Sequence, residues 1–267
     1  MPTERIEDLD DPRLAVYRSL KATNRTRGLD HFIVEGEKLV ERLVASRYPV
    51  RSILVTDRHL SRLGAALPED APVYVVPFEK VHDLVGFPFH QGALACGGRL
   101  PQPDWRALWA GDDGPLTLAI CPKISNPENL GSIARLCDVF GVDGILAGPS
   151  CPDPFSRRVL RVSMGSALRV PILVSTDPLA LSRELGEALG MSFWAAVADE
   201  TAAPFESLAP PRRLGLVLGD ENEGVDADWV ARCDQSITIP MRGAASSLNV
   251  STAAAILLYH VTRRAGG

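Results

Sequence analysis

The chain has 267 residues, of which 46% are hydrophobic and 23% are charged, and its formal net charge is −5. These values are ordinary for a globular protein with room for two cores, and no apolar run is long enough to cross a bilayer. Segment 1–11 is polar and acidic, unlike a signal peptide. The five cysteines include no CxxC pair, which disfavours a disulfide framework or a zinc site and favours the reducing cytoplasm.

The first part of the chain predicts a small α/β domain over residues 1–97. Helical spacing covers 12–24, and short strands and helices alternate after it. The expected strands are 32–34, 53–55, 73–76 and 93–96, and the expected helices are 35–46, 58–67 and 78–85. Residues 98–115 carry prolines and glycines without periodicity, so we interpret them as a linker.

Residues 116–267 predict a second α/β domain with a parallel sheet. Segment 116–121 is a continuous apolar run, which is typical of a strand buried on both faces. The expected strands are 116–121, 144–147, 172–174, 193–197, 214–218 and 236–239, alternating with helices at 130–140, 155–168, 179–189, near Trp229 and at the end of the chain. This pattern predicts a doubly wound sheet, in which ligands bind beyond the carboxyl ends of the strands.

The last helix and the loop before it have unusual compositions. Gly243–Ser247 carries almost no side-chain volume, which allows close approach of the backbone to a ligand or to another piece of chain. Ala253–Leu258 leaves the helix without a polar face for two turns, so we expect the core or a second subunit to cover it on all sides. Asn249 or Ser251 can cap this helix.

Basic residues gather in two clusters. The first contains Arg13, Arg18, Lys21, Arg25 and Arg27, and the second contains Arg157, Arg158, Arg161 and Arg169. Such runs are commonly solvated helix faces, and the net charge does not favour nucleic acid as a partner. Two all-positive patches on an acidic protein nevertheless favour a polyanion. The candidate substrate-binding residues are Arg25, Arg27, Arg157 and Arg161.

Three loops follow predicted strands of the second domain, so we expect them on one rim of the sheet. They span residues 126–135, 219–224 and 239–249. In the first loop Asn129 stands at the expected N-cap of a helix, and Arg135, six residues later, points elsewhere. Alone, the first loop is also compatible with a turn and a capped helix, and the second with a tight turn and nothing more.

Several common motifs are missing. The chain has no GxGxxG after a strand, no GxxxxGK[ST], no GxSxG and no HExxH, and its five histidines are scattered. Nucleotide-hydride chemistry, phosphoryl transfer and metal-dependent hydrolysis are therefore disfavoured, and we expect no metal site.

Taken together, the three loops carry a specific resemblance. They read NPENLGSIARLCDVFG, LVLGDENEG and IPMRGAASSLNVSTAAAI, and in this order they resemble the three motifs of the SpoU/TrmH family of RNA ribose 2′-O-methyltransferases, of the SPOUT class. The resemblance covers about residues 116–264. The segments RTRGLDHFIVEGEKLV and FHQGALA are similar to the small RNA-binding domain that many family members carry at the N-terminus.

The resemblance implies a trefoil-knotted SPOUT domain over 116–267, packed as a homodimer and binding S-adenosylmethionine among the knotted loops. It implies RNA as the partner, ribosomal RNA more than tRNA, and neither a membrane nor a metal. The implied cofactor-binding residues are Leu218, Gly219, Ile239, Met241 and Leu248. The implied active-site residues are Asn129, Arg135, Glu221, Ser247 and Asn249.

The implied chemistry is displacement at a sulfonium methyl by a ribose hydroxyl. The enzyme must bring oxygen and methyl within about 3–3.5 Å and help to remove one proton. Because a guanidinium stays charged, we expect Arg135 to grip a phosphate beside the target ribose, and that phosphate or a water to accept the proton. Asn129, Ser247 and Asn249 would hydrogen-bond the ribose or hold Arg135, and Glu221 would orient these groups.

Two alternatives from other classes stay open. One is a catalytically silent RNA-binding member of the fold, against which the five active-site residues together argue. The other is an α/β enzyme acting on a small substrate, with the first domain as a lid. The sequence also departs from the family at Asn126, where many members have Asp, so any role of a carboxylate at that position is absent.

Overall fold

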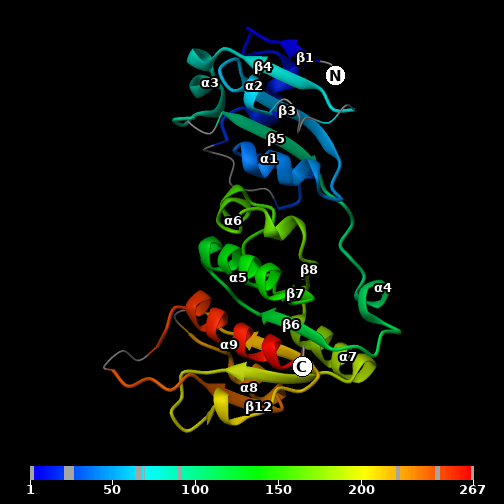
Figure 1. Cartoon of the computed structure of the whole chain (residues 1–267), viewed down its shortest axis with the longest axis vertical. Coiled ribbons are helices and arrows are strands. Elements are labelled where there is room, and N and C mark those ends of the chain that lie inside the picture. Colours follow the sequence, from blue (N-terminus) through cyan, green and yellow to red (C-terminus); the bar gives the residue numbers. More distant parts are fainter. Residues whose placement is uncertain are drawn as a thin grey trace. The chain divides into compact units, whose positions relative to one another are not determined.

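The computed structural model describes residues 3–20, 27–63, 68, 70–89, 92–220, 223–243 and 247–265. The chain divides into two compact units, here called unit 1 and unit 2 (Figure 1). Unit 1 is Met1–Pro101 with Asp153–Arg169, and unit 2 is Gln102–Pro152 with Val170–Gly267. The predicted domain limits, 1–97 and 116–267, stay predictions. They assign residues 153–169 to the second domain, whereas these residues belong to unit 1.

Unit 1 is built on a five-stranded mixed sheet with the order β1-β4-β3-β5-β2. Strand β4 pairs in parallel with β1 and β3, whereas β5 runs antiparallel to β2 and β3. Its elements are β1 (Thr3–Arg5), the 3-10 helix η1 (Pro12–Tyr17), β2 (His31–Glu35), α1 (Glu37–Val44), β3 (Val50–Thr56), α2 (Leu60–Leu63), β4 (Val73–Val76), α3 (Phe78–Val85), β5 (Ala93–Gly98), α6 (Arg157–Val162) and the 3-10 helix η3 (Ser166–Leu168).

Two helices predicted for the sequence of unit 1 are shorter than expected. In the described part of the helix expected at 12–24, only the 3-10 helix η1 forms, because the backbone becomes extended at Arg18 and Ser19 has a φ of 53°, and residues 21–24 lie outside the described residues. The helix expected at 155–168 is two pieces, α6 and η3. They are separated by Met164 and Gly165, whose φ values of 52° and 78° lie in the left-handed region and interrupt the helix.

The segment Asp153–Arg169 packs into unit 1 through rings and buried charges. The ring of Phe155 lies 5.0 Å from that of Phe32 and 5.3 Å from that of Tyr48. Nη2 of Arg157 donates to Oε2 of Glu35 at 2.6 Å, and their side chains are 15% and 8% exposed. The segment therefore completes the core of unit 1, although it lies far along the chain.

Replacing Arg157 with alanine should lower the free energy of unfolding by roughly 3 kcal/mol, because Glu35 is left charged and buried without its partner. Chemical denaturation followed by tyrosine and tryptophan fluorescence measures this change. Arg58→Ala is the matched control, since its pair with Glu79 is exposed and screened by solvent. Equal losses in the two variants would contradict the assigned role of Arg157.

Unit 2 contains a seven-stranded sheet with the order β10-β12-β9-β11-β6-β7-β8, in which every pair of neighbouring strands is parallel. Its elements are α4 (Trp105–Trp109), β6 (Leu116–Cys121), α5 (Pro127–Phe140), β7 (Gly144–Ala147), β8 (Ile172–Val174), α7 (Pro178–Leu189), β9 (Ser192–Ala196), β10 (Ala203–Pro204), the 3-10 helix η4 (Phe205–Ser207), β11 (Arg213–Leu218), α8 (Ala227–Arg232), β12 (Gln235–Thr238) and α9 (Val250–Ala265). The expectation of a parallel α/β sheet is confirmed.

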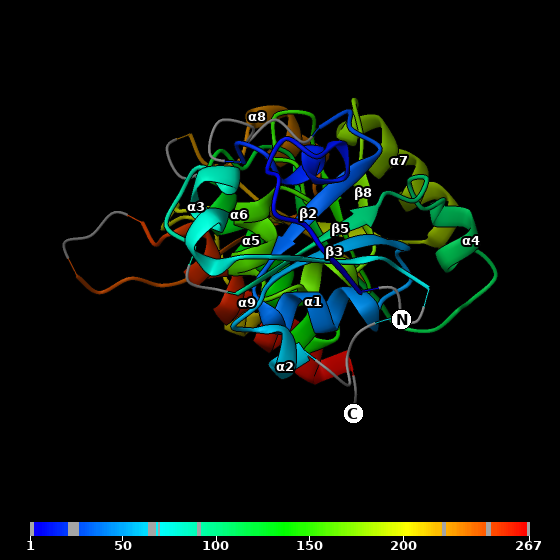
Figure 2. The same ribbon diagram turned by 90° about the horizontal axis from the view of Figure 1, so that it is seen from above.

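The segment interpreted as a linker contains a helix that belongs to the core of unit 2. Trp105 and Trp109 of α4 are both buried in the same hydrophobic cluster as the strands of the sheet. Helix α4 lies beside α7 in both views, and Arg106 pairs with Glu184 of α7 (Figures 1 and 2). The neighbouring prolines and glycines obscured this short helix in the sequence, but two tryptophans four residues apart, on one face of a helix, were a signal of burial.

Helix α9 packs against α5 with one face (Figure 1). The buried residues of α9 are Val250, Ala254, Leu257, Leu258 and Val261, of which Val250 and Leu257 line the pocket described below. On another face Tyr259 is 48% exposed. Unit 2 itself thus does not cover α9 on all sides, and covering by a second subunit stays a prediction.

Candidate active site

The segments that follow β6, β9, β11 and β12 leave the sheet of unit 2 at one edge. These strands are neighbours in the sheet and run parallel, so their carboxyl ends lie together. The three loops singled out in the sequence follow β6, β11 and β12. The structure therefore brings them to the same rim, as expected.

The loop after β6 ends at Asn126, which caps α5. Its side-chain oxygen accepts a hydrogen bond from the backbone N–H of Glu128 at 2.8 Å, and Pro127 occupies the first helical position, where no N–H is needed. The expectation that Asn129 caps this helix is wrong, because the helix begins one turn earlier. Asn129 instead lies in the first turn and is 5% exposed.

Asn129 and Asn249 meet across the site. Nδ2 of Asn249 donates to Oδ1 of Asn129 at 3.2 Å. Oδ1 of Asn249 accepts from the backbone N–H of Ser251 at 2.9 Å and from its hydroxyl at 2.6 Å, so Asn249 caps α9, as anticipated. One amide thus fixes the start of α9 and orients the amide of Asn129.

Asn249→Ala and Asn249→Asp should separate these two roles. The alanine variant loses the cap and is expected to lose about 1 kcal/mol of stability. The aspartate variant keeps an oxygen for Ser251 but cannot donate to Asn129, so its melting temperature should stay close to that of the parent. Both variants should lose the activity of the site, because neither holds the amide of Asn129 in its present orientation. Full activity of the aspartate variant would contradict this assignment.

The other implied active-site residues are placed less closely together. Arg135 lies on an exposed face of α5, and no described residue forms an ion pair with it. Ser247 is exposed and borders the pocket described next. Glu221 lies outside the described residues. The structure therefore joins Asn129 to Asn249 and leaves Arg135 available to an external anion.

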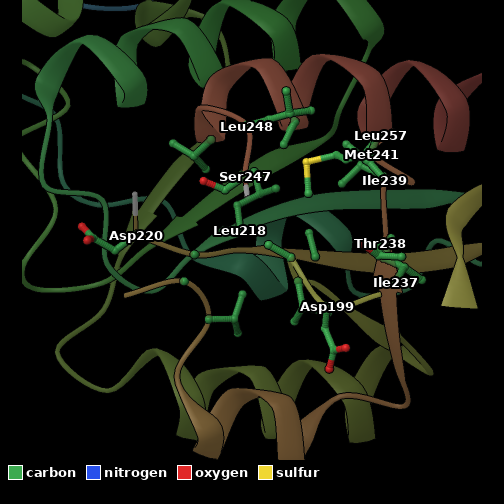
Figure 3. A pocket seen from close by; sticks show the side chains of 18 of the residues that line it. Asp199, Leu218, Asp220, Ile237, Thr238, Ile239, Met241, Ser247, Leu248 and Leu257 are labelled. Atoms are coloured by element: carbon green, nitrogen blue, oxygen red, sulfur yellow. The ribbon is translucent and has the colours of Figure 1, made fainter. Parts of the chain in front are cut away.

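A pocket of about 420 Å³ opens at this rim of unit 2 (Figure 3). Its walls come from the segments after β9, β11 and β12 and from the start of α9. All five residues that the sequence suggested for the cofactor line it: Leu218, Gly219, Ile239, Met241 and Leu248. Ile239, Met241 and Leu257 gather at one end of the pocket, whereas Ser247 and Asp220 lie toward the other.

Close packing of main chain forms the wall at Gly219. A Cβ atom at this position would stand 2.2 Å from the carbonyl carbon of Gly224. Asp220 and Gly224 exchange two backbone hydrogen bonds of 2.9 Å, which close the loop between them. The close approach expected for the loop Gly243–Ser247 stays a prediction, since a Cβ at Gly243 would meet no protein atom within 4 Å. Residues 244–246 lie outside the described residues.

The segment after β9 contributes to the pocket although the sequence analysis did not single it out. Ala196–Asp199 lines one side. The hydroxyl of Thr201 donates to the carboxylate of Asp199 at 2.7 Å and lowers its pKa, so this wall carries a negative charge at neutral pH. The signal was available, because a fourth strand was predicted to end at the same edge of the sheet.

Buried thiols near the rim do not supply a nucleophile. Burial raises the pKa of Cys121 and of Cys137 well above the ordinary range, which keeps both thiols protonated. Within the described residues no group of three His, Cys, Asp or Glu side chains is arranged to hold a metal ion.

The four candidate substrate residues all belong to the sequence of unit 1. Arg161 on α6 and Arg27 are exposed, and Arg25 lies outside the described residues. Arg157 instead uses its guanidinium within unit 1, bonding Glu35 and the carbonyl of Leu20 and lying 4.4 Å from the ring centre of Phe87. A contact between Arg157 and substrate would require that network to open.

Comparison with known proteins decides the family. The model of the SpoU rRNA Methylase family matches residues 117–259, which include all three loops of the rim. The chain belongs to the SpoU rRNA Methylase family. An uncharacterized tRNA/rRNA methyltransferase of Mycobacterium tuberculosis is 35% identical to it over 264 residues, covering 96% of this chain and 90% of the relative.

Two further comparisons are also with RNA methyltransferases. The 23S rRNA (guanosine(2553)-2′-O)-methyltransferase RlmP of Bacillus subtilis is 26% identical, covering 97% of this chain and 99% of the relative. An rRNA methyltransferase of Sinorhizobium meliloti, solved with AdoMet bound, superposes with a TM-score of 0.82 at 21% identity over 98% of both chains, which shows the shared fold. The predicted family, fold class and methyltransferase activity are confirmed.

Proposed function

We propose that this SpoU-family protein transfers a methyl group from S-adenosylmethionine to a ribose 2′-hydroxyl of RNA. The observation that carries the proposal is the pocket at the carboxyl ends of parallel strands, bordered by the same loops that join Asn129 to Asn249. Ribosomal RNA is the proposed substrate in preference to tRNA, in line with the name of the Bacillus subtilis relative.

The pocket suits this methyl donor. Its volume falls within the range of small-molecule sites, and Leu218, Ile239 and Leu248 offer apolar surface to a flat purine. The close main chain at Gly219 presents backbone polar groups instead of a side chain. The charged carboxylate of Asp199 favours a cationic ligand over an anionic one.

The chain's own residues then have separable tasks. S-adenosylmethionine supplies a sulfonium methyl and leaves as a neutral thioether, so the leaving group needs no metal. The hydrogen-bonded amides of Asn129 and Asn249 are fixed in place to orient a ribose hydroxyl. The exposed guanidinium of Arg135 binds a phosphate beside that ribose, and the phosphate or a water accepts the proton. Ser247 and Glu221 complete the proposed site.

Unit 1 is proposed to bind the RNA, with Arg27 and Arg161 as exposed contacts and Arg25 as a further candidate. Arg157 is kept as a candidate because it belongs to the same basic cluster as Arg161, although its guanidinium already bonds Glu35. These contacts predict an affinity for RNA that falls as the salt concentration rises. We also place the reaction in the cytoplasm, where free cysteines stay reduced.

A homodimer is proposed on the open face of α5 and α9. Val139 is 66% exposed, and the ring of Phe140 lies 5.7 Å from that of Tyr259. Side chains of this kind, exposed together, are typical of surfaces that pack against another protein. The trefoil knot implied by the family stays part of this proposal. Sedimentation equilibrium of the intact chain measures the subunit number directly.

The test of the function has two stages. Calorimetric titration of S-adenosylmethionine should show one site per chain, and tritiated donor with total RNA should label ribose 2′-hydroxyls. Failure to bind the donor would contradict the proposal, and binding without transfer would favour a silent RNA-binding protein. Label on a small molecule would favour the remaining alternative. Comparing ribose methylation in cells with and without the protein identifies the nucleotide.

A further inference from the structure

Two side-chain pairs tie the loop after β11 to the loop after β6. The hydroxyl of Ser125 donates to Oδ2 of Asp220, and Lys123 pairs with Glu223. Ser125 immediately precedes the helix cap Asn126, and Asp220 immediately follows Gly219. Both pairs therefore join the segment that starts α5 to the wall of the pocket.

The two pairs differ in how far solvent weakens them. Asp220 is only 6% exposed and lines the pocket, whereas the side chains of Lys123 and Glu223 are 37% and 60% exposed. A hydrogen bond to a buried carboxylate is strong, while an exposed ion pair contributes little. The contact between Ser125 and Asp220 is thus the one able to fix the distance between the two loops.

Asp220 is well placed to transmit that constraint to the pocket. Its backbone N–H and carbonyl both bond Gly224 at 2.9 Å, so the loop is closed at its base. Gly219, beside it, packs directly on Gly224 and leaves no space for adjustment. Asp220 itself lines the pocket next to Gly219, so the contact with Ser125 acts on a residue of the pocket wall. Figure 3 shows Asp220 at the same end of the pocket as Ser247.

At its other end, the contact between Ser125 and Asp220 is connected to the side-chain amides of Asn129 and Asn249. Ser125 is one residue before the cap of α5, and Asn129 lies in the first turn of that helix. The backbone N–H of Asn129 bonds the carbonyl of Asn126 at 3.1 Å, so the segment that carries Ser125 is connected directly to the turn that carries the amide of Asn129. Asn129 in turn bonds Asn249. We propose that Ser125 and Asp220 are positioning residues that hold the donor pocket in register with the amides of Asn129 and Asn249.

This inference rests on the proposed function, and binding of the donor tests it apart from turnover. Ser125→Ala removes the donor of the hydrogen bond, Asp220→Ala removes the acceptor, and Asp220→Asn keeps an acceptor oxygen. The first two variants should raise the calorimetric Kd for S-adenosylmethionine about five- to tenfold, because the wall must be ordered upon binding. Asp220→Asn should stay within about twofold of the parent.

Two controls make the result specific. Ser207→Ala removes an exposed hydroxyl that bonds only a backbone carbonyl among the described residues, and it should leave the Kd unchanged. Circular dichroism at the temperature of the titration confirms that each variant is folded. The Kd for a model RNA should also stay unchanged, since neither Ser125 nor Asp220 is proposed to contact RNA.

Each outcome decides the proposal. Parental donor affinity in folded Ser125→Ala would overturn it, and this exposed position allows the test even if Asp220→Ala does not fold. A loss of affinity in Asp220→Asn as large as in Asp220→Ala would also overturn it, because the charge and not the hydrogen bond would then be responsible. Absence of donor binding by the parent chain would instead contradict the proposed function.

Discussion

Replacing Gly219 with alanine is expected to abolish detectable binding of S-adenosylmethionine. The added Cβ would stand 2.2 Å from the carbonyl carbon of Gly224 and 2.4 Å from the backbone nitrogen of Val225. Both atoms belong to main chain, so no side-chain rotation relieves the clash, and the loop that borders the pocket must move. Calorimetry with the donor measures the loss, which should reach at least about a hundredfold in Kd.

The control for this variant is Gly114→Ala in the same unit. There the nearest atom to an added Cβ is a carboxylate oxygen of Asp112, at the end of a side chain that can rotate. This variant should bind the donor as the parent does. If Gly219→Ala also kept parental affinity, the pocket at the end of β11 would not be the donor site.

Replacing Arg135 with alanine should abolish methyl transfer while leaving the Kd for the donor within a few-fold. The guanidinium lies on the exposed face of α5 and is absent from the pocket walls, so its loss leaves the donor site intact. Removing a charged donor that acts at the reacting centre costs about a hundredfold or more in turnover. Arg135→Lys should recover only part of the activity, since an ammonium cannot grip phosphate with two parallel bonds.

Single-turnover tritium transfer at saturating donor measures this effect. Arg183→Ala, at another exposed position on a helix of unit 2, is the control for loss of a surface charge. Wild-type turnover by Arg135→Ala would show that the phosphate contact assigned to this side chain is wrong.

The buried strands of unit 2 were the most predictable part of the fold. Segments 116–121, 144–147 and 172–174 coincide with β6, β7 and β8. Strands buried on both faces must be apolar throughout, so the first and last residue of each apolar run mark the limits of the strand. The helix starts were harder to place. Asn126 followed by Pro127 is a signal for a helix start, but the apolar spacing begins only at Leu130, and the predicted start was placed there.

The pocket lining was predictable only through the resemblance of three loops to one family. Pattern alone indicated a common rim, but it did not single out Leu218, Ile239 or Leu248 as walls of one cavity. Asp199 was missed because a single carboxylate after a strand resembles any polar turn. The bond between Asn249 and Asn129 spans 120 residues and depends on how the strands are ordered in the sheet.

Contacts within unit 1 that cross the sequence could not be predicted from local pattern. Arg157 resembled a surface charge because its cluster contains no acid, yet its partner Glu35 stands 122 residues earlier. Local spacing holds no information about such a pair, and only the folded chain reveals that the guanidinium is already engaged.

The membership of Asp153–Arg169 in unit 1 bears on how such a protein can be rebuilt or can evolve. A graft that exchanges residues 1–101 for the corresponding part of a relative would separate Phe32 and Tyr48 from Phe155 and leave Glu35 without Arg157. An exchange of unit 1 must therefore transfer residues 1–101 and residues 153–169 together. Substitutions in residues 153–169 should occur together with compensating substitutions in residues 1–101, even where they do not affect the reaction.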